Sequence, residues 1–354
     1  MSIERERAAI DEIDDQILAL LNQRAKSALT IGREKGRRAQ APFSPARERR
    51  VFDRLTTANP GPLPNEGLLS IYREIIAVHR QLEAPATIAY LGPAGTFSHM
   101  AVLRKFGARA DARPAESIAD VFDQVEKSAA TFGVVPMENS TEGVVDVTLD
   151  LFVESSLDIC AEIYLDVDHY LLSRSSMQEV TRIYSMRQPL AQCQVWVKTN
   201  LPRAELQEVA STARAAQLAA QEPGSAAIAT KLAATLYELN IIGERIQDSP
   251  HNRTRLLVVG RAPEAEPSGC DKTSIMFSVR HEAGALYQAL SVLDRHHINM
   301  TMIESRPTKK TPWEYNFFVD VQGHIGDPPL AEALEHLRAA TLFMRVLGSY
   351  PEAE

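Results

Sequence analysis

The chain from Arg5 to Lys35 contains no proline, and positions spaced alternately by three and four residues form one face of a long helix. This face consists of Arg7, Ile10, Asp14, Ile17, Leu21, Arg24, Ala28, Ile31 and Lys35. At 1.5 Å per residue the helix would be about 45 Å long, too long for the shorter helices that follow to cover. We therefore expect a second subunit to complete its core, in a homodimer or a higher homo-oligomer.

Two shorter helices should follow in the same unit. Ser44-Pro45 is typical of an N-cap followed by proline at the first helical position, and it would open the second helix. The proline-rich stretch 59–64 then breaks the chain. The third helix is predicted from a stripe formed by Leu68, Tyr72, Ile75, His79 and Leu82. Residues 1–85 should therefore form an all-helical domain.

After Pro85 the pattern changes to short apolar runs that alternate with helical segments. The runs are 87–91, 132–135, 159–163, 182–184 and 226–229. Such alternation is typical of an α/β domain, which we place at 86–262.

Beyond a segment of linker composition at 263–269, the pattern predicts a third domain at 272–350. Its elements are a strand at 273–280, a helix at 284–296, strands at 298–305 and 314–322, a helix at 328–339 and a strand at 342–349. This order is the βαββαβ arrangement of an α+β, ferredoxin-like fold.

Composition supports a multidomain globular protein and excludes several classes. Hydrophobic residues make up 45% and charged residues 24% of 354 residues, so each unit can bury a core. No apolar run approaches the roughly 20 residues that span a bilayer, and the charged start lacks a signal peptide, so we expect no membrane and a cytoplasmic location. A net charge of -8 argues against nucleic acid as a partner. Three dispersed cysteines, with no His cluster at ligand spacing, predict no metal.

Three cations interrupt the apolar face of the first helix: Arg7, Arg24 and Lys35. An unpaired charge is costly to bury, so something anionic should meet them. Alternatively, Arg7 and Lys35 reach water near the helix ends and Arg24 pairs with an acidic neighbour. Taken with Arg47, Glu48 and Glu83, the set resembles the all-helical chorismate mutase family over residues 3–83.

The resemblance assigns roles residue by residue. Arg7 of the partner subunit, Arg24 and Arg47 would bind the substrate carboxylates. Lys35 and Glu83 would face the ether oxygen of chorismate, and Glu48 would hold its hydroxyl. Glu83 must then be protonated to donate, so mutase activity should fall as pH rises. Ser44 stands where many relatives have Asp and His79 where some have a small hydroxyl residue, which leaves a purely dimerising helical domain open.

Three polar segments lie at strand boundaries of the α/β unit: 92–99, 135–143 and 252–256. The first, Gly92 to His99, is by itself either an anion-binding turn at a helix start or an ordinary βα turn. In this order, and with Ser185 and Leu190–Cys193, the segments resemble prephenate dehydratase over residues 86–262. That family has two α/β lobes like a periplasmic binding protein, with substrate between them.

Prephenate loses its ring hydroxyl and carbon dioxide, and aromatisation drives the reaction without a cofactor. The enzyme must hold the anions and assist departure of hydroxide. The resemblance assigns the leaving oxygen to Thr254, with Arg255 as a nearby cation and Glu138 as the alternative proton donor. Further contacts would be Thr96, Ser98, Asn139, Ser140, Ser185 and Gln192. Leu256 replaces the usual aromatic residue and Met186 a frequent histidine.

Two motifs of the last unit resemble the ACT regulatory domain in its phenylalanine-binding form. They are Gly284-Ala285-Leu286 at a helix start and Glu304-Ser305-Arg306-Pro307 at a strand end. The resemblance implies that L-phenylalanine binds where two such domains pair and inhibits the enzyme by feedback.

Together the three units resemble the bifunctional chorismate mutase/prephenate dehydratase family of phenylalanine biosynthesis. Chorismate and prephenate would be its substrates and L-phenylalanine its effector. Two alternatives stay open. One is a monofunctional prephenate or arogenate dehydratase, and the other is a non-catalytic sensor of prephenate or an amino acid.

Overall fold

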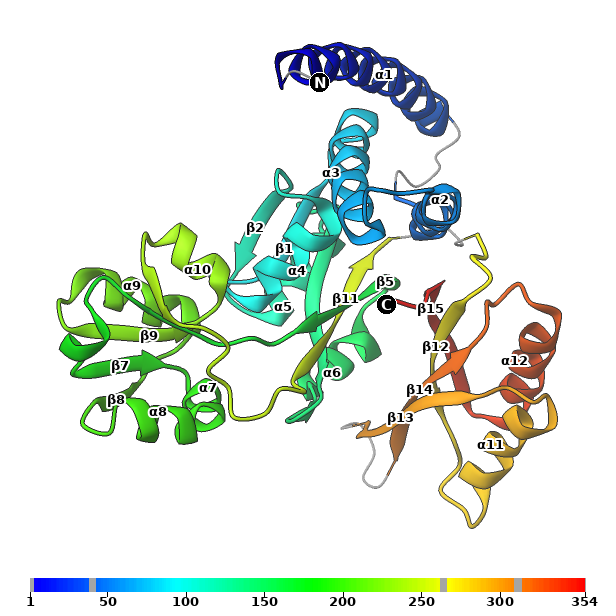
Figure 1. Cartoon of the computed structure of the whole chain (residues 1–354). Helices are drawn as coiled ribbons and strands as arrows, with labels where there is room; N and C mark the ends of the chain where they lie inside the picture. Colours follow the sequence, from blue (N-terminus) through cyan, green and yellow to red (C-terminus); the bar gives the residue numbers. More distant parts are fainter. Residues whose placement is uncertain (1–2, 38–42, 262–265, 309–313, 354) are drawn as a thin grey trace.

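The computed structural model describes residues 3–37, 43–261, 266–308 and 314–353. Along the chain it forms an all-α unit, an α/β unit of two lobes and a small α+β unit (Figure 1). This is the fold class expected from the sequence.

The helical unit consists of α1 (Ile3–Arg37), α2 (Pro45–Ala58) and α3 (Asn65–Glu83). Ser44 caps α2 as predicted, because its hydroxyl accepts a hydrogen bond from the backbone N–H of Arg47 at 3.3 Å. Helix α1 packs on α3 at the outer edge of the molecule (Figure 1). Much of its apolar face is uncovered in the single chain, with Ile10 55% and Ile17 48% exposed.

The first lobe of the α/β unit is built on a sheet with strand order β2-β1-β3-β11-β5, and β4 pairs with β3. The strands are β1 (Thr87–Leu91), β2 (Asp111–Ala115), β3 (Phe132–Asn139), β4 (Gly143–Val144), β5 (Asp158–Asp166) and β11 (Arg253–Gly260). Strand β11 runs antiparallel to both of its neighbours. The helices of this lobe are α4 (Phe97–Phe106), α5 (Ile118–Glu126) and α6 (Asp146–Glu154).

The second lobe has strand order β10-β6-β9-β7-β8. Its strands are β6 (Tyr170–Ser173), β7 (Arg182–Ser185), β8 (Glu205–Glu208), β9 (Ser225–Ala229) and β10 (Asn240–Gly243). Its helices are η1 (Met177–Glu179), α7 (Arg187–Gln192), α8 (Gln194–Asn200), α9 (Thr212–Gln221) and α10 (Lys231–Leu236). The chain enters this lobe after β5 and returns before β11, and the two crossings are joined where Val167 N–H donates to Asn252 O at 2.8 Å.

The third unit has the predicted βαββαβ order. Its elements are β12 (Asp271–Ser278), α11 (Ala285–Arg295), β13 (Met300–Pro307), β14 (Tyr315–Gln322), α12 (Pro328–Ala340) and β15 (Phe343–Pro351). The antiparallel sheet has the order β13-β14-β12-β15, so β13 is an edge strand. Both helices pack on one face of the sheet, while Met276, Phe318 and Tyr350 on the other face join the core of the first lobe. Within the described ranges no helix is long and apolar enough to cross a membrane.

Candidate functional site

Thr254 lies on β11 directly opposite Asn139 of β3. The hydroxyl oxygen of Thr254 accepts a hydrogen bond from Asn139 Nδ2 at 2.9 Å. Because this contact uses a lone pair of the oxygen, the hydroxyl hydrogen is left to donate to another molecule. Thr254 is therefore a donor whose oxygen is held in place.

The amide of Asn139 is fixed by the turn that follows it. Its Oδ1 accepts from the backbone N–H groups of Thr141 at 3.0 Å and Glu142 at 3.2 Å. Its Nδ2 also donates to Asn252 Oδ1 at 2.8 Å. These bonds orient the amide so that its donor side faces Thr254, which explains why an asparagine in this turn supports a threonine 115 positions away.

Gln192, at the end of α7, connects the two lobes. Its Nε2 donates to Glu142 Oε1 at 3.2 Å, and its Oε1 accepts from Asn252 Nδ2 at 3.1 Å. Both partners belong to the segments around Thr254. The predicted contacts Asn139, Gln192 and Thr254 therefore do come together, from three segments far apart in the sequence.

His169 was not predicted, although it follows a strand end as the other polar segments do. It is buried in the crossing between β5 and β6, and its Nε2 lies 2.8 Å from Gln192 Oε1. Its ring meets that of Phe97 edge to face, with centroids 5.7 Å apart. Burial lowers the pKa of His169, opposed by Gln192, and so favours the neutral ring.

The neutral His169 has one ring nitrogen without a partner. Gln192 Oε1 can only accept, so Nε2 carries the proton and Nδ1 presents a lone pair. Among the described residues, Nδ1 is buried and has no hydrogen-bond partner. His169 therefore offers an unused acceptor at the junction of the lobes.

The segment 92–99 meets the second lobe through its backbone. Thr230 donates to Gly95 O at 2.7 Å, and the Tyr237 hydroxyl donates to Ala94 O at 2.9 Å. Gly95 has a φ of +91°, a conformation that favours glycine, and a Cβ there would approach Ala233 of α10 to 3.4 Å. The segment forms a wall against the second lobe.

Two predicted contacts in this wall differ in their roles. The Thr96 side chain caps α4, accepting from His99 N–H at 3.4 Å and donating to Pro93 O at 3.0 Å. Ser98 is buried in the first turn of the same helix. Thr96 thus shapes the wall through its backbone contacts.

Ser140 and Ser185 also bond to backbone groups. Ser140 Oγ accepts from Arg253 N–H at 2.9 Å, which holds the start of β11. Ser185 is buried and donates to Ile228 O at 2.7 Å. Both hydroxyls therefore stabilise the strand ends that surround the junction.

Arg255 does not lie beside the Thr254 hydroxyl, because successive side chains alternate across β11. It is buried on the opposite side of the sheet, 2.8 Å from Glu162 and 2.6 Å from Asp320 of the third unit. Burial alone would lower the pKa of Arg255, but the surrounding phenol and carboxylates raise it overall. The prediction that Arg255 contacts substrate is corrected: it joins the first lobe to the third unit.

The strand register also separates Glu138 from Thr254. Glu138 pairs with Arg255, whereas Asn139 pairs with Thr254, and a bulge follows at this point of the ladder. The predicted alternative proton donor thus belongs to the Arg255 side of the sheet. Leu256, as expected, is a packing residue buried in the first-lobe core, and Met186 precedes α7 without capping it.

In the helical unit, Lys35 of α1 and Glu83 of α3 form an ion pair at 2.6 Å. Arg24 of α1 is half-buried, and burial lowers its pKa while the nearby Tyr72 opposes the shift. These contacts bring three residues predicted for the mutase site, Lys35, Glu83 and Arg24, to the α1–α3 interface.

The remaining predicted mutase residues lie elsewhere in the single chain. Arg47 is exposed, and Glu48 pairs with Arg80 at 3.4 Å. Arg7 is exposed and precedes Lys35 by 28 positions on the same helix, which is about 42 Å. A single chain therefore cannot bring Arg7 to Lys35. His79, where some relatives carry a hydroxyl, is buried with ring nitrogens 2.5 Å from Ile75 O and 3.3 Å from Leu21 O.

The two motifs of the third unit are on its surface. Gly284 caps α11 with φ +82°, and a Cβ added to it would meet no atom within 4 Å, so the helix start is open. Ala285 is buried beneath it and Leu286 is half-buried. Glu304 and Ser305 lie on the edge strand β13, where Glu304 is half-buried and Ser305 exposed.

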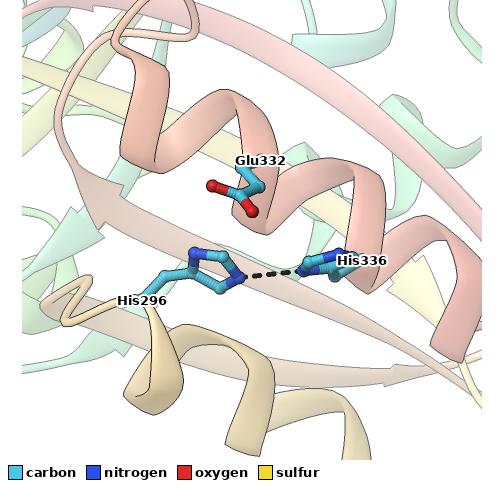
Figure 2. Close-up of side chains that lie close together, drawn as sticks. All are labelled: His296, Glu332 and His336. Atoms are coloured by element: carbon cyan, nitrogen blue, oxygen red, sulfur yellow. Dashed lines mark hydrogen bonds between the residues drawn. The ribbon is translucent and has the colours of Figure 1, made fainter.

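One group of side chains of the third unit could hold a metal ion, although sequence spacing gave no indication of it. His296 at the end of α11 and Glu332 and His336 on α12 point toward one another (Figure 2). Their ligand atoms all lie within 4.8 Å of each other. Sequence spacing could not reveal the group because His296 is 40 positions from His336.

Comparison with known families divides the chain into three matches. Residues 6–84 match chorismate mutase type II, residues 88–264 match prephenate dehydratase and residues 273–339 match the ACT domain. The bifunctional chorismate mutase/prephenate dehydratase of Aquifex aeolicus is 46% identical over 98% of this chain and 97% of its own length.

Two solved structures each match 75% of this chain. A prephenate dehydratase from Arthrobacter aurescens in complex with L-Phe is 32% identical, with a TM-score of 0.71 over 75% of this chain and 90% of that one. A protein described as a novel type of quorum quenching acylase, GqqA, is 30% identical, with a TM-score of 0.70 over 75% and 98% of the two chains.

Proposed function

The chain belongs to the bifunctional chorismate mutase/prephenate dehydratase family, and from this premise we propose which side chains carry each activity. The protein is an enzyme with a mutase unit, a dehydratase unit and an ACT domain. It rearranges chorismate to prephenate and converts prephenate to phenylpyruvate, carbon dioxide and water. We place the unit boundaries at 1–85, 86–262 and 272–350.

The dehydratase step is carried by the Thr254 hydroxyl at the junction of the two lobes. Its oxygen is held by Asn139, so its hydrogen can be donated to the ring hydroxyl of prephenate. As the carboxylate leaves as carbon dioxide, the electrons of the broken C–C bond aromatise the ring and expel that hydroxyl. A threonine is too weak an acid to protonate the leaving group outright, so Thr254 orients it and stabilises its developing charge.

The surrounding side chains would position the substrate. Gln192 and Asn139 bridge the lobes around Thr254, and the wall 92–99 with Thr96 and Ser98 closes one side. Ser140 and Ser185 hold the strand ends. Glu138 pairs with Arg255 in the strand register, so we assign the leaving hydroxyl to Thr254 and not to Glu138.

The mutase step needs no nucleophile, because a pericyclic rearrangement is promoted by confinement and by stabilisation of charge at the breaking C–O bond. We assign the ether oxygen to the Lys35 and Glu83 pair and one carboxylate to Arg24. Arg7 of the partner subunit, Arg47 and Glu48 would complete the site. This assignment requires a homodimer or a higher oligomer, which is supported by the uncovered face of α1.

L-Phenylalanine would bind at the ACT domain, as the complex of the Arthrobacter relative suggests. The open helix start at Gly284, Ala285 and Leu286 and the edge strand with Glu304 and Ser305 provide backbone groups for an amino acid. Binding there would favour a less active state and lower the affinity for prephenate reciprocally. A shared fold does not carry function by itself, so the acylase relative adds no activity here.

The Thr254 hydroxyl is tested by a pair of substitutions. Thr254→Ala should lower kcat/KM for prephenate roughly 100-fold or more, because one pre-organised donor is lost. Thr254→Ser keeps the hydroxyl and should retain most of the activity. The measurement is the steady-state rate of phenylpyruvate formation. The mutase activity of each variant serves as the control for correct folding. Near-normal turnover by the alanine variant would overturn the assignment.

A further inference from the structure

A cavity of about 250 Å³ lies where all three units meet, and all but one of its lining residues lie outside the proposed catalytic sites. Its walls come from one face of α2, one face of α3, helix α4, strand β5, and the end of β15 with the two residues that follow it. The α3 positions are Leu69, Arg73, Ile76 and Arg80, whereas Glu83 of the proposed mutase site faces α1. Glu48 is the one residue that the cavity shares with that proposed site.

The cavity walls carry more unpaired positive than negative charge. Five cations line it: Arg49, Arg73, Arg80, Arg104 and Lys105. Within the described ranges Arg73, Arg104 and Lys105 make no ion pair. Four carboxylates also line the cavity, and three of them are in ion pairs. Glu48 pairs with Arg80 and Asp53 with Arg49. Glu162 pairs with Arg255 and Lys272, so Glu352 is the remaining acidic residue of the wall.

Arg80 lines the cavity, and its guanidinium is held in place by neighbouring groups. Its guanidinium lies over the rings of Phe43 and Phe106, with distances of 5.0 and 5.2 Å to the centroids. Its Nη2 donates to Lys105 O at 3.2 Å, while Nη1 is buried without a hydrogen-bond partner in the described part of the chain. Arg80 therefore adds a fixed positive charge, paired with Glu48, to the wall of the cavity.

The neighbouring cations repel one another. Burial lowers the pKa of Lys105, and Arg80 and Arg73 lower it further against the attraction of Glu48. Partial burial likewise lowers the pKa of Arg104, and Arg73 adds to the effect. Like charges held together in this way favour a bound anion. The remaining wall is apolar and includes Phe52, Ile76 and Ile163.

We propose that this cavity binds a small organic dianion with an apolar body, through Arg73, Arg80, Arg104 and Lys105. The walls belong to three units, so its occupancy is linked to the way in which the mutase helices sit on the dehydratase sheet. The proposal does not depend on the catalytic assignments above.

Calorimetric titration of the full chain with phenylsuccinate, and separately with inorganic phosphate, tests this site. The double variant Arg73→Gln/Arg104→Gln should lose one binding equivalent of phenylsuccinate or bind it roughly tenfold or more weakly. Arg109→Gln, which removes an exposed charge of the same lobe outside the cavity, should match the wild type.

Both reactions should proceed at wild-type rates in the double variant, which separates this site from the catalytic ones. Arg80→Met should also weaken phenylsuccinate binding. Identical isotherms for wild type and double variant would overturn the proposal. Binding of phosphate without phenylsuccinate would contradict the apolar part of it.

A second inference rests on the cluster of His296, Glu332 and His336 (Figure 2). The two residues of α12 are one helical turn apart and face the end of α11. His296 Nε2 lies 2.9 Å from His336 Nδ1. Zn²⁺ bonds to nitrogen at about 2.0–2.1 Å in a tetrahedral site, so the nitrogens need to separate only slightly to share one ion.

We infer that this cluster binds a divalent ion of the zinc class, with water completing the coordination. It lies at the opposite end of α11 from Gly284, 12 positions or about 18 Å away, and is separate from the phenylalanine motif. Its ligands are two imidazoles and a carboxylate, a set that suits such ions.

Titration of the chelator-treated full chain with zinc chloride tests this site. The wild type should bind one equivalent of zinc. His336→Gln and Glu332→Gln should each lower the zinc affinity roughly tenfold or more. His297→Asn removes an adjacent exposed histidine, and asparagine tolerates the left-handed φ of 54° found there, so this control should bind as the wild type does. Equal zinc affinity in His336→Gln and wild type would refute the site.

Discussion

Thr254 and Arg255 are adjacent on β11 but contact different parts of the molecule. Thr254 contacts Asn139 beside the second lobe, whereas Arg255 contacts Glu162 and Asp320 toward the ACT domain. A shift of β11 would therefore reach both the proposed catalytic hydroxyl and the sensor. Sequence alone placed both residues near substrate because a motif reveals which residues are present but not the direction of each side chain.

The proposed donation by Glu83 to the ether oxygen predicts a pH dependence for the mutase reaction. An ion pair requires the ionised carboxylate, but donation to the ether oxygen requires the protonated acid. Mutase activity should fall as pH rises, while Glu83→Gln, a permanent donor, should give a flatter profile. Rates of chorismate consumption from pH 5 to 9 measure this. A flat wild-type profile that the substitution leaves unchanged would exclude the role.

His169 should make stability depend on pH. Burial lowers its folded pKa below the ordinary value of about 6.5, so the unfolded chain takes up a proton first as pH falls. The contribution of neutral His169 to the free energy of unfolding is complete above about pH 6.5. It is lost as pH falls through the pKa of His169 in the folded protein. The drop in melting temperature between pH 8 and 5.5 should be smaller in His169→Gln. An equal drop in both proteins would contradict this.

At the scale of elements, periodicity predicted the three helices of the first unit and the whole βαββαβ order of the third unit. The long helix, the Ser44 cap and the strands at 87–91 and 226–229 all follow from local pattern. Strand β8 could not be predicted because its four residues are exposed and show no apolar alternation. His169 was not predicted because its role depends on the two segments that connect the lobes, and these meet only in the folded chain.

Helix α1 also supplies a test of the proposed assembly. Ile17→Glu places a charge on the partly uncovered face, so it should dissociate the oligomer and abolish mutase activity, since Arg7 would come from the partner. Dehydratase activity should persist. Ala19→Glu, on the opposite side of α1, is the matched control. Mass by light scattering and both rates are measured. A dissociated chain with full mutase activity would contradict the shared site.

At the scale of the whole molecule, three units in one chain place two consecutive reactions beside a sensor. The lobes are joined around Thr254, the ACT sheet shares a core with the first lobe, and the helices meet both at a charged cavity. The order of the units was evident from composition and pattern. Their packing was not, because it depends on contacts such as Arg255 with Asp320 that link distant segments.

The central claim is that one chain carries both activities at separate sites. The most direct test supplies chorismate to the purified wild type and to Thr254→Ala, and follows chorismate, prephenate and phenylpyruvate over time. The wild type should consume chorismate and form phenylpyruvate, whereas Thr254→Ala should consume chorismate at a similar rate and accumulate prephenate. Failure of the wild type to consume chorismate, or undiminished phenylpyruvate from the variant, would contradict the account.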